Sequence, residues 1–108
     1  MRNWRKNILE RYKVKISSRA MRELDSIYEY IVIEKLDPEN AKRQVDRIKK
    51  AILSLDTFPK SHQERNEGGY AGKGYRQFII DHYIAIFRID ETVKTVYVVT
   101  IQYQGQSL

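Results

Sequence analysis

The side chains that could carry out chemistry in this sequence are basic and aromatic rather than paired acids or metal ligands. The chain has two histidines, His62 and His82, and no cysteine. Neither histidine stands at a ligand-like spacing from Asp or Glu, so a zinc site is not expected. Nothing in the spacing of serines and histidines suggests a nucleophilic triad. His82 falls in a predicted turn, where exposure to solvent is the favoured interpretation.

Arginine, lysine and tyrosine occur together in the C-terminal third. Arg76, Arg88 and Lys94 fall on or between predicted strands, and Tyr97 and Tyr103 have matching parity on the last strand. Residues of the same parity share a face of a strand, so we expect both tyrosines on one face. An open sheet face with arginine and tyrosine can bind RNA phosphates and stack on bases. It can equally bind a protein partner, and packing within the fold remains the simpler explanation for any single tyrosine.

The segment 60–74, which precedes these strands, carries four glycines and several basic residues, including Lys73. Glycines among basic residues can bind phosphate, but neither phosphate-loop spacing is present. The segment also follows a helix and precedes a strand, which is the wrong order for a helix N-terminus to receive an anion. We therefore expect a mobile basic loop suited to contacts with a partner.

Predicted strands position these side chains. The run 75–90 contains two apolar stretches around the polar pair Asp81-His82, which predicts two antiparallel strands joined by a tight turn. A third strand is predicted over Val93–Tyr103. Near the N-terminus, apolar and basic residues alternate over Tyr12–Ile16, which predicts another strand with its lysines facing outwards.

Two amphipathic helices occupy the sequence between the first strand and the loop. Ser17 or Ser18 is the expected N-cap of a helix that runs to about Lys35. The pair Asp37-Pro38 begins a second helix, which is expected to end before a Phe-Pro pair. The short connection predicts an antiparallel hairpin. The order strand-helix-helix-strand-strand-strand predicts an α+β fold, in which the hairpin covers one face of a mostly antiparallel four-stranded sheet and leaves the other face open.

Composition and charge limit the setting in which the protein works. A chain of 108 residues with 42% hydrophobic and 31% charged residues is typical of one small globular domain. Its net charge of +6 resides in residues 1–19, which carry seven basic residues and one acidic residue. We interpret 1–11 as a basic N-terminal extension and 12–108 as a single domain. The extension suits nucleic acid or an acidic protein, and a solvated, poorly ordered terminus explains it equally well. The lack of cysteine and of a long apolar run predicts a cytoplasmic protein without membrane contact.

Several motifs follow one another in a recognisable order. They are Tyr12-Lys-Val-Lys-Ile-Ser; Ala20, Leu24 and Ile27-Tyr28-Glu29-Tyr30-Ile31; Ala41, Ile48, Ile52, Leu55 and Phe58-Pro59; Tyr75-Arg76; Tyr83-Ile-Ala-Ile-Phe87-Arg-Ile-Asp90; and Val96-Tyr97-Val98. Their order and spacing over residues 12–104 resemble the RelE/ParE superfamily of toxins. The resemblance implies a growth-inhibiting bacterial toxin of a type II toxin–antitoxin module, a cognate antitoxin as its partner, and no cofactor.

The resemblance leaves the target open between ribosome-bound mRNA and DNA gyrase. RelE-like members cut mRNA on the ribosome without a metal, whereas ParE-like members poison gyrase and need no nuclease site. In the nuclease branch an arginine follows the tyrosine that begins the middle strand, but here Ile84 follows Tyr83. The stretch Tyr103-Gln104-Gly105-Gln106 also lacks the arginine that relatives often carry. The first departure counts against a nuclease. Ile84 and Gln106 together support a third interpretation, an inactive antitoxin-binding module.

For a ribosome-dependent ribonuclease, the resemblance implies roles for a small set of residues. Arg76 would contact the scissile phosphate, Arg88 or Lys73 would add charge, and Tyr103 would orient the base or the 2′-hydroxyl. Further candidates for contacts with RNA or with another target are Lys73, Tyr75 and Lys94. No metal ligand is expected.

Overall fold

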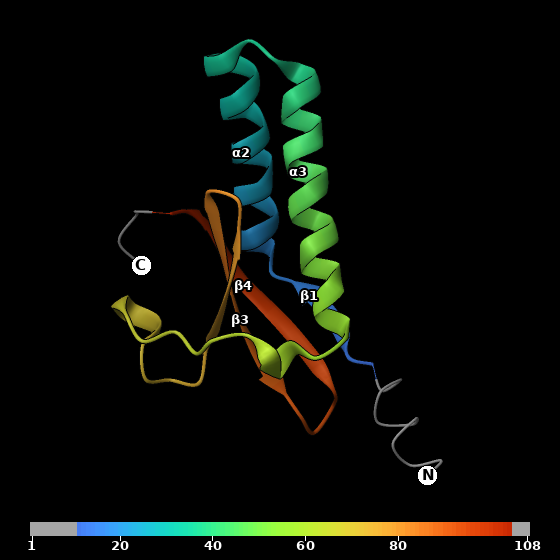
Figure 1. Cartoon of the computed structure of the whole chain (residues 1–108), viewed down its shortest axis with the longest axis vertical. Helices are drawn as coiled ribbons and strands as arrows, with labels where there is room; N and C mark the ends of the chain where they lie inside the picture. The colour runs from blue at the N-terminus through green and yellow to red at the C-terminus, as the bar shows by residue number, and fades with distance from the viewer. Residues whose placement is uncertain (1–10, 105–108) are drawn as a thin grey trace.

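The described part of the chain forms a four-stranded sheet and a helical hairpin (Figure 1). The computed structural model describes residues 11–104, so the predicted extension 1–11, apart from Arg11, lies outside the described residues, as does Gln106. The regular elements are β1 (Lys13–Ile16), α2 (Ser18–Lys35), α3 (Pro38–Leu53), β2 (Arg76–Ile80), β3 (Tyr83–Asp90) and β4 (Thr95–Tyr103). Short 3-10 turns between α3 and β2 are η1 (Ser54–Asp56), η2 (Pro59–Ser61) and η3 (Gly68–Tyr70). The predicted element order is confirmed.

The sheet is mostly antiparallel, as predicted. Its strand order is β1-β4-β3-β2, and only β1 and β4 among the described strands pair in parallel. In the β3–β4 pair, Ile86 lies opposite Thr100 but Phe87 lies opposite Val98, so Val99 is an extra residue in β4. Such a bulge interrupts the two-residue alternation of side chains along a strand.

The bulge places Tyr97 and Tyr103 on opposite faces of the sheet. Tyr97 lies opposite Arg88 on the face away from the helices, and its ring contacts the Arg88 guanidinium. Tyr103 lies opposite Tyr83, which belongs to the core beneath the helices. The prediction that both tyrosines share a face was therefore wrong, because it assumed an uninterrupted strand.

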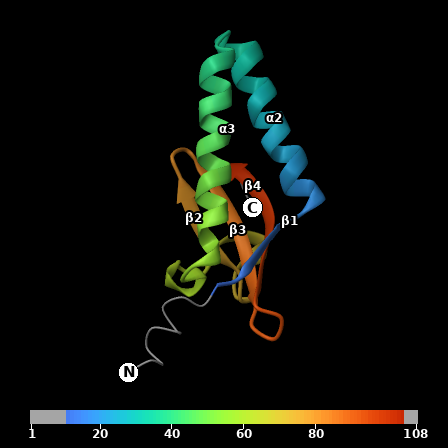
Figure 2. The same ribbon diagram turned by 90° about the vertical axis from the view of Figure 1, so that its right-hand side faces the viewer.

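Side-chain caps fix where the helices begin. The Ser17 side chain accepts a hydrogen bond from the Ala20 N–H, and the Asp37 side chain accepts one from the Asn40 N–H. Each cap satisfies a backbone donor that the first helical turn leaves without a partner. Both helices then lie on one side of the sheet, with α3 in front of the strands in Figure 2. The hairpin extends beyond the end of the sheet, which gives the molecule its elongated shape (Figure 1).

The core lies between the hairpin and the sheet. Fully buried large side chains from all layers meet there, and burial of each contributes roughly 1.5–3 kcal/mol. The largest of them are Leu24, Ile48, Ile52, Leu55, Phe87, Val96, Val98 and Ile101. These residues come from the apolar faces of the two helices and from alternating positions of the strands.

The face of the sheet away from the helices is less open than the alternation of residues suggests. Ile84 and Ile86 lie on this face but are only 7% and 0% exposed. Arg65, from the connection before β2, is also buried and donates a 2.9 Å hydrogen bond to Gln77 Oε1. The sheet face that was expected to be open is therefore covered beside β2 and around Ile84 and Ile86.

The connection before β2 is paired with the sheet rather than independent of it. The Gln77 N–H donates to the Gln63 carbonyl at 2.9 Å, and the Arg65 N–H donates to the Tyr75 carbonyl at 2.7 Å. Segment 63–65 thus follows the outer edge of β2 in the antiparallel sense. This pairing occupies backbone groups that an edge strand would otherwise leave exposed.

Candidate functional site

Arg76, the predicted phosphate-binding residue, is used to hold the neighbouring loop. It begins β2, on the same face of that strand as Phe78 and Ile80. Its Nη1 donates to the His62 carbonyl at 2.7 Å, and its Nη2 lies 4.0 Å from Glu64 Oε1. The side chain is 25% exposed. The guanidinium is therefore engaged by the protein's own chain.

His62, which sequence reasoning left without a role, packs beside this contact. Its ring centroid lies 4.3 Å from that of Phe78 and 5.8 Å from that of Phe87. Burial and the nearby Arg76 charge hold the pKa of His62 below its ordinary value. The histidine thus packs against two strands, and no spacing in the sequence signals this place.

Arg88 lies on the opposite face of the sheet. It is exposed on β3, and its guanidinium carbon lies 4.3 Å from the ring centroid of Tyr97. Such a cation–π contact orients the plane of the guanidinium while leaving its N–H donors available. Arg88 and Arg76 therefore point into different surroundings.

Tyr103 ends β4, near the turn between β2 and β3. It is 56% exposed, and its ring lies 5.7 Å from the ring of Tyr83 and 6.4 Å from that of His82. His82 is exposed, as predicted. Through the strand register, Arg76 stands beside Phe87 and Val98, five residues before Tyr103. Because Val99 is an extra residue in β4, Arg76 and Tyr103 are separated along the strands by the four residues from Phe87 to Tyr83, which is roughly 14 Å at about 3.4 Å per residue.

The remaining candidates are also dispersed. Lys73 is exposed in the loop, and Tyr75 is half-buried with its ring 4.9 Å from that of Tyr70. Lys94 lies in the β3–β4 turn, where its Nζ pairs with Glu91 at 2.9 Å. Arg76, Arg88 and Tyr103 do not meet at one point. The other candidates, Lys73, Tyr75 and Lys94, do not cluster around any of the three.

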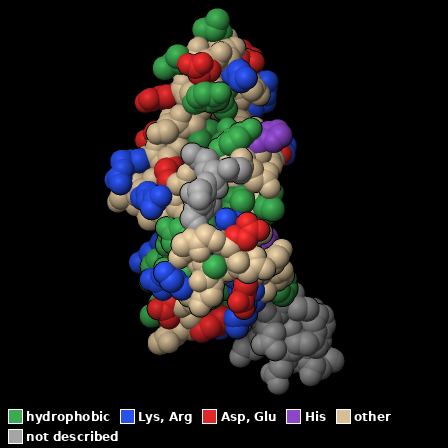
Figure 3. All heavy atoms as spheres, turned by 90° about the vertical axis from the view of Figure 1, so that its left-hand side faces the viewer, with side chains coloured by type: hydrophobic (Ala, Val, Ile, Leu, Met, Phe, Trp, Pro, Cys, Tyr) green, Lys and Arg blue, Asp and Glu red, His purple; other side chains and the backbone are tan. Residues whose placement is uncertain are grey.

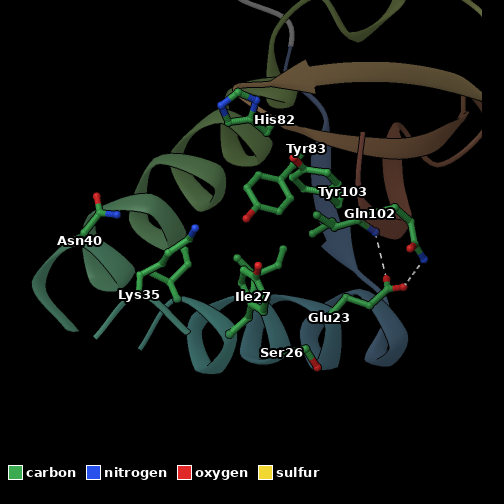
Figure 4. Close-up of a pocket in the computed structure, with 12 residues that line it drawn as sticks. Glu23, Ser26, Ile27, Lys35, Asn40, His82, Tyr83, Gln102 and Tyr103 are labelled. Atoms are coloured by element: carbon green, nitrogen blue, oxygen red, sulfur yellow. Dashed lines mark hydrogen bonds between the residues drawn. The ribbon is translucent and has the colours of Figure 1, made fainter. Parts of the chain in front are cut away.

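A groove of about 830 Å³ lies between α2 and the end of β4. Its apolar surface is aromatic and aliphatic. Figure 4 shows side chains of the strand ends, among them Tyr83 and Tyr103, opposite Ile27 and Lys35 of α2. Burial and the neighbouring tyrosines raise the pKa of Tyr83. The lining residues are Glu23, Ser26, Ile27, Tyr30, Ile31, Lys35, Asn40, His82, Tyr83, Ile101, Gln102 and Tyr103.

Glu23 joins the two walls of this groove. Strand β1 ends opposite Val98, and beyond that point no strand of the described residues lies beside this edge of β4. Glu23 Oε1 accepts the Ile101 N–H at 2.9 Å and the Thr100 hydroxyl at 2.9 Å, and Gln102 Nε2 donates to Oε2 (Figure 4). One helix carboxylate thus replaces the missing strand. In the sequence, Glu23 is indistinguishable from the other surface acids of α2.

Asp81 ties the β2–β3 turn, which borders the groove, to α3. Its carboxylate accepts two hydrogen bonds from Arg47 at 3.0 and 2.9 Å and one from Gln44 at 2.9 Å. These bonds, led by the one from Arg47, lower the pKa of Asp81. Asp81 also has a positive φ of 55°, as the turn requires. The groove is therefore bordered by elements that are tied together.

Within residues 11–104, no group of three or more His, Cys, Asp and Glu side chains could hold a metal ion. No helix in the same range combines the length and apolar character of a membrane span. Within the same residues the structure presents an aromatic groove, an arginine stacked on a tyrosine, and exposed basic residues.

Comparison with known proteins agrees with this architecture. The family described as "ParE toxin of type II toxin-antitoxin system, parDE" matches residues 14–108. A chain from the chromosomal ParDE system of P. aeruginosa superimposes with a TM-score of 0.71 at 22% identity, covering 88% of this chain and 98% of that one. A chain of the RelBE2 toxin–antitoxin complex from Mycobacterium tuberculosis gives 0.59 at 17% identity, covering 91% and 97%. A YoeB/ParE toxin from Agrobacterium tumefaciens gives 0.55 at 18% identity, covering 85% and 98%. A comparison with curated protein sequences found no significant match.

Proposed function

The chain belongs to the ParE toxin family of type II toxin–antitoxin systems, and from this premise we propose that it inhibits growth by binding DNA gyrase rather than by cutting mRNA. The observation that carries the choice of target is the dispersal of the residues that a nuclease would need. Electrostatic catalysis at a phosphate requires donors within about 3 Å of the same developing charge. Arg76 and Tyr103 stand at opposite ends of the sheet, and Arg88 lies on its other face.

The position after Tyr83 supports the same choice. Ile84 lies on the sheet face away from the helices, between Ile79 of β2 and Gln102 of β4. It is 7% exposed and apolar, so it offers no donor to a phosphate. Its neighbours on this part of the face are an exposed isoleucine and a glutamine amide that is held by Glu23. A surface of this kind suits contact with a protein better than charge stabilisation at phosphorus.

We place the antitoxin in the groove between α2 and β4. Tyr30, Ile27 and Ile31 occur at the spacing that receives the apolar face of an amphipathic helix, which is a recurring mode of peptide recognition. The basic side chains of Lys35 and His82 lie at the rim of the groove. Glu23 also lines the groove, but its carboxylate is hydrogen-bonded to β4. The expected occupant is therefore an antitoxin helix with aliphatic anchors on one side and acidic residues beside them.

Induction of the chain without its antitoxin tests the choice of target. We expect growth to stop, plasmid DNA to lose negative supercoils, and transcript ends on ribosomes to remain unchanged. Arg76→Ala should preserve this toxicity in a protein that still folds, because Arg76 only holds the loop. New cuts in ribosome-bound mRNA that decrease by about a hundredfold in Arg76→Ala would instead identify a ribonuclease. Normal growth at full expression would identify an inactive antitoxin-binding module.

A further inference from the structure

A row of basic residues crosses the sheet on the face away from the helices. It consists of Lys13 and Lys15 on β1 and Arg88 on β3, with Tyr97 of β4 between them, and is called the basic strip below. Figure 3 shows the side of the molecule opposite to Figure 2, on which Lys and Arg side chains are interspersed with Asp and Glu side chains. The basic strip lies apart from the groove, which is formed at the other end of β4.

The strand register places the strip on one face. Lys15 and Arg88 both lie opposite Tyr97, from the two sides of β4, and Lys13 lies opposite Thr95. Val14 and Ile16, which alternate with the lysines, pack against the core on the other face. With strands about 4.8 Å apart, the strip spans roughly 10 Å across three strands.

The cations of the strip are available to a ligand. Lys13, Lys15 and Arg88 are exposed, and none takes part in the ion pairs formed among residues 11–104. In contrast, Arg47 is paired with Asp81 and Lys60 with Glu91. Arg88 is also preoriented, because its guanidinium lies 4.3 Å from the Tyr97 ring centroid. A stacked guanidinium keeps its planar donors in a fixed direction, which suits a phosphate.

We infer that the basic strip contacts the phosphate backbone of the nucleic acid that the toxin's target carries. The choice of occupant follows from charge complementarity. A protein that binds DNA or RNA presents a basic surface to it, so an unpaired basic strip is repelled by that surface and attracted by the nucleic acid. Duplex DNA carries one negative charge per roughly 1.7 Å of its axis, so a strip of this width meets several phosphates.

This inference rests on the proposed function only for the source of the nucleic acid. Gyrase would supply duplex DNA, and a ribosome would supply RNA. Contact with phosphates can be measured in the absence of either target. If the gyrase proposal is wrong, the supercoiling experiment shows it. If the basic strip does not contact phosphates, the direct measurement of nucleic-acid binding shows it.

The test measures fluorescence anisotropy of labelled duplex DNA and of single-stranded RNA of equal length, titrated with the full chain at several salt concentrations. The strip variant is K13Q/K15Q/R88Q. The control is K42Q/K49Q/K50Q, which gives the same net charge. It removes three exposed charges of α3 that form no ion pair within residues 11–104. Both variants must keep the thermal midpoint of the wild type. Residues 1–11 are the same in both variants, so any contribution of the basic extension to binding is equal in the two.

The salt dependence gives the expected size of the effect. Each phosphate contact contributes about 0.9 to the slope of log K against log salt, so three contacts contribute about 2.7. This corresponds to a roughly 40-fold loss of affinity between 50 and 200 mM salt. We expect the strip variant to lose this part of the slope and to bind at least tenfold more weakly at 50 mM salt. The control should retain the wild-type slope.

Three results would overturn the inference. They are equal losses in the two variants, an unchanged slope in the strip variant, and a wild-type chain that binds neither nucleic acid at 50 mM salt. If the strip variant keeps nucleic-acid binding but loses binding to nucleic-acid-free gyrase, the strip recognises an acidic protein surface instead. Stronger binding to DNA than to RNA, lost only in the strip variant, identifies a DNA-carrying target.

Discussion

Replacement of Glu23 by alanine tests whether one helix carboxylate holds the end of the sheet. Glu23 Oε1 accepts from the Ile101 N–H at 2.9 Å and from the Thr100 hydroxyl at 2.9 Å. Thr100 and Ile101 are 0% and 2% exposed. The Glu23 side chain is itself 21% exposed, so solvent only partly screens it. Glu23→Ala leaves a buried backbone donor and a buried hydroxyl without their acceptor.

The structure gives the size of this loss. A hydrogen bond to a charged group contributes about 1.5–3 kcal/mol, and a buried donor left unsatisfied costs about 1–3 kcal/mol. Because these terms overlap, we expect Glu23→Ala to lower the free energy of unfolding by about 2–4 kcal/mol. In a chain of this length, that shifts the thermal midpoint downwards by roughly 10–20 °C. Glu23→Gln keeps an acceptor oxygen and should lose about half as much.

Urea unfolding at pH 7, followed by circular dichroism, measures the effect. Glu29→Ala is the matched control, because Glu29 is an exposed acid on the same helix and has no ion pair among the described residues. We expect the control to stay within about 0.5 kcal/mol of the wild type. A Glu23→Ala chain that is as stable as the Glu29→Ala chain would show that solvent satisfies the edge of β4. Glu23 would then not hold the groove as a fixed site.

Three further predictions concern the core, the turn and the groove. Ile48→Asp should abolish cooperative unfolding, because it buries a charge at a position with 0% exposure, whereas Lys49→Asp on the exposed side of α3 should fold normally. Hydrogen bonds from Lys94, Lys60 and Tyr12 lower the pKa of Glu91 to about 2, so the unfolded chain takes up a proton at Glu91 first as the pH falls. Glu91 therefore stabilises the fold above about pH 4.5, and this contribution is lost as the pH falls towards 2. In the Glu91→Gln chain, the thermal midpoint should depend less on pH within that window than in the wild type. Tyr30→Ala should weaken antitoxin binding by at least tenfold in calorimetry, because Tyr30 lines the groove, whereas Tyr28→Ala, which removes a tyrosine outside the groove, should leave it unchanged.

Local sequence signals were sufficient to predict most of the fold. The caps at Ser17 and Asp37 bond as their residue types suggest, and the turn after Ile80 lies where the polar pair interrupts two apolar runs. These features depend on neighbours in the sequence, so they can be read from it. The start of β4 was predicted two residues early, because Lys94 adopts a positive φ of 49° in the turn.

The residues that share a face of the sheet could not be predicted as well as the order of the elements. The bulge at Val99 depends on how β4 pairs with β3, and no residue type in β4 announces it. It moved Tyr103 away from Tyr97 and so separated two residues that alternation had put together. The groove also escaped prediction, because it depends on the long-range bonds of Glu23 to β4 and of Asp81 to α3. A sequence shows which residues are polar but not which distant backbone they reach.

If the chain binds gyrase, the separation of its basic and aromatic residues has a functional explanation. A nuclease concentrates its donors at one phosphate, whereas a toxin that holds a large assembly benefits from separate contact surfaces. In this chain the groove, the Ile79–Ile84 area and the basic strip are three such surfaces. The antitoxin, which we place in the groove, would occupy only the first of them directly.

Supercoiling of relaxed plasmid by purified gyrase and ATP, with increasing amounts of the antitoxin-free chain, shows whether this protein inhibits gyrase. We expect supercoiling to decrease with the dose of the chain, and to return when an antitoxin that binds the groove is added. Full supercoiling at every dose, from a chain that still stops growth and produces new cuts in ribosome-bound mRNA, would contradict the claim.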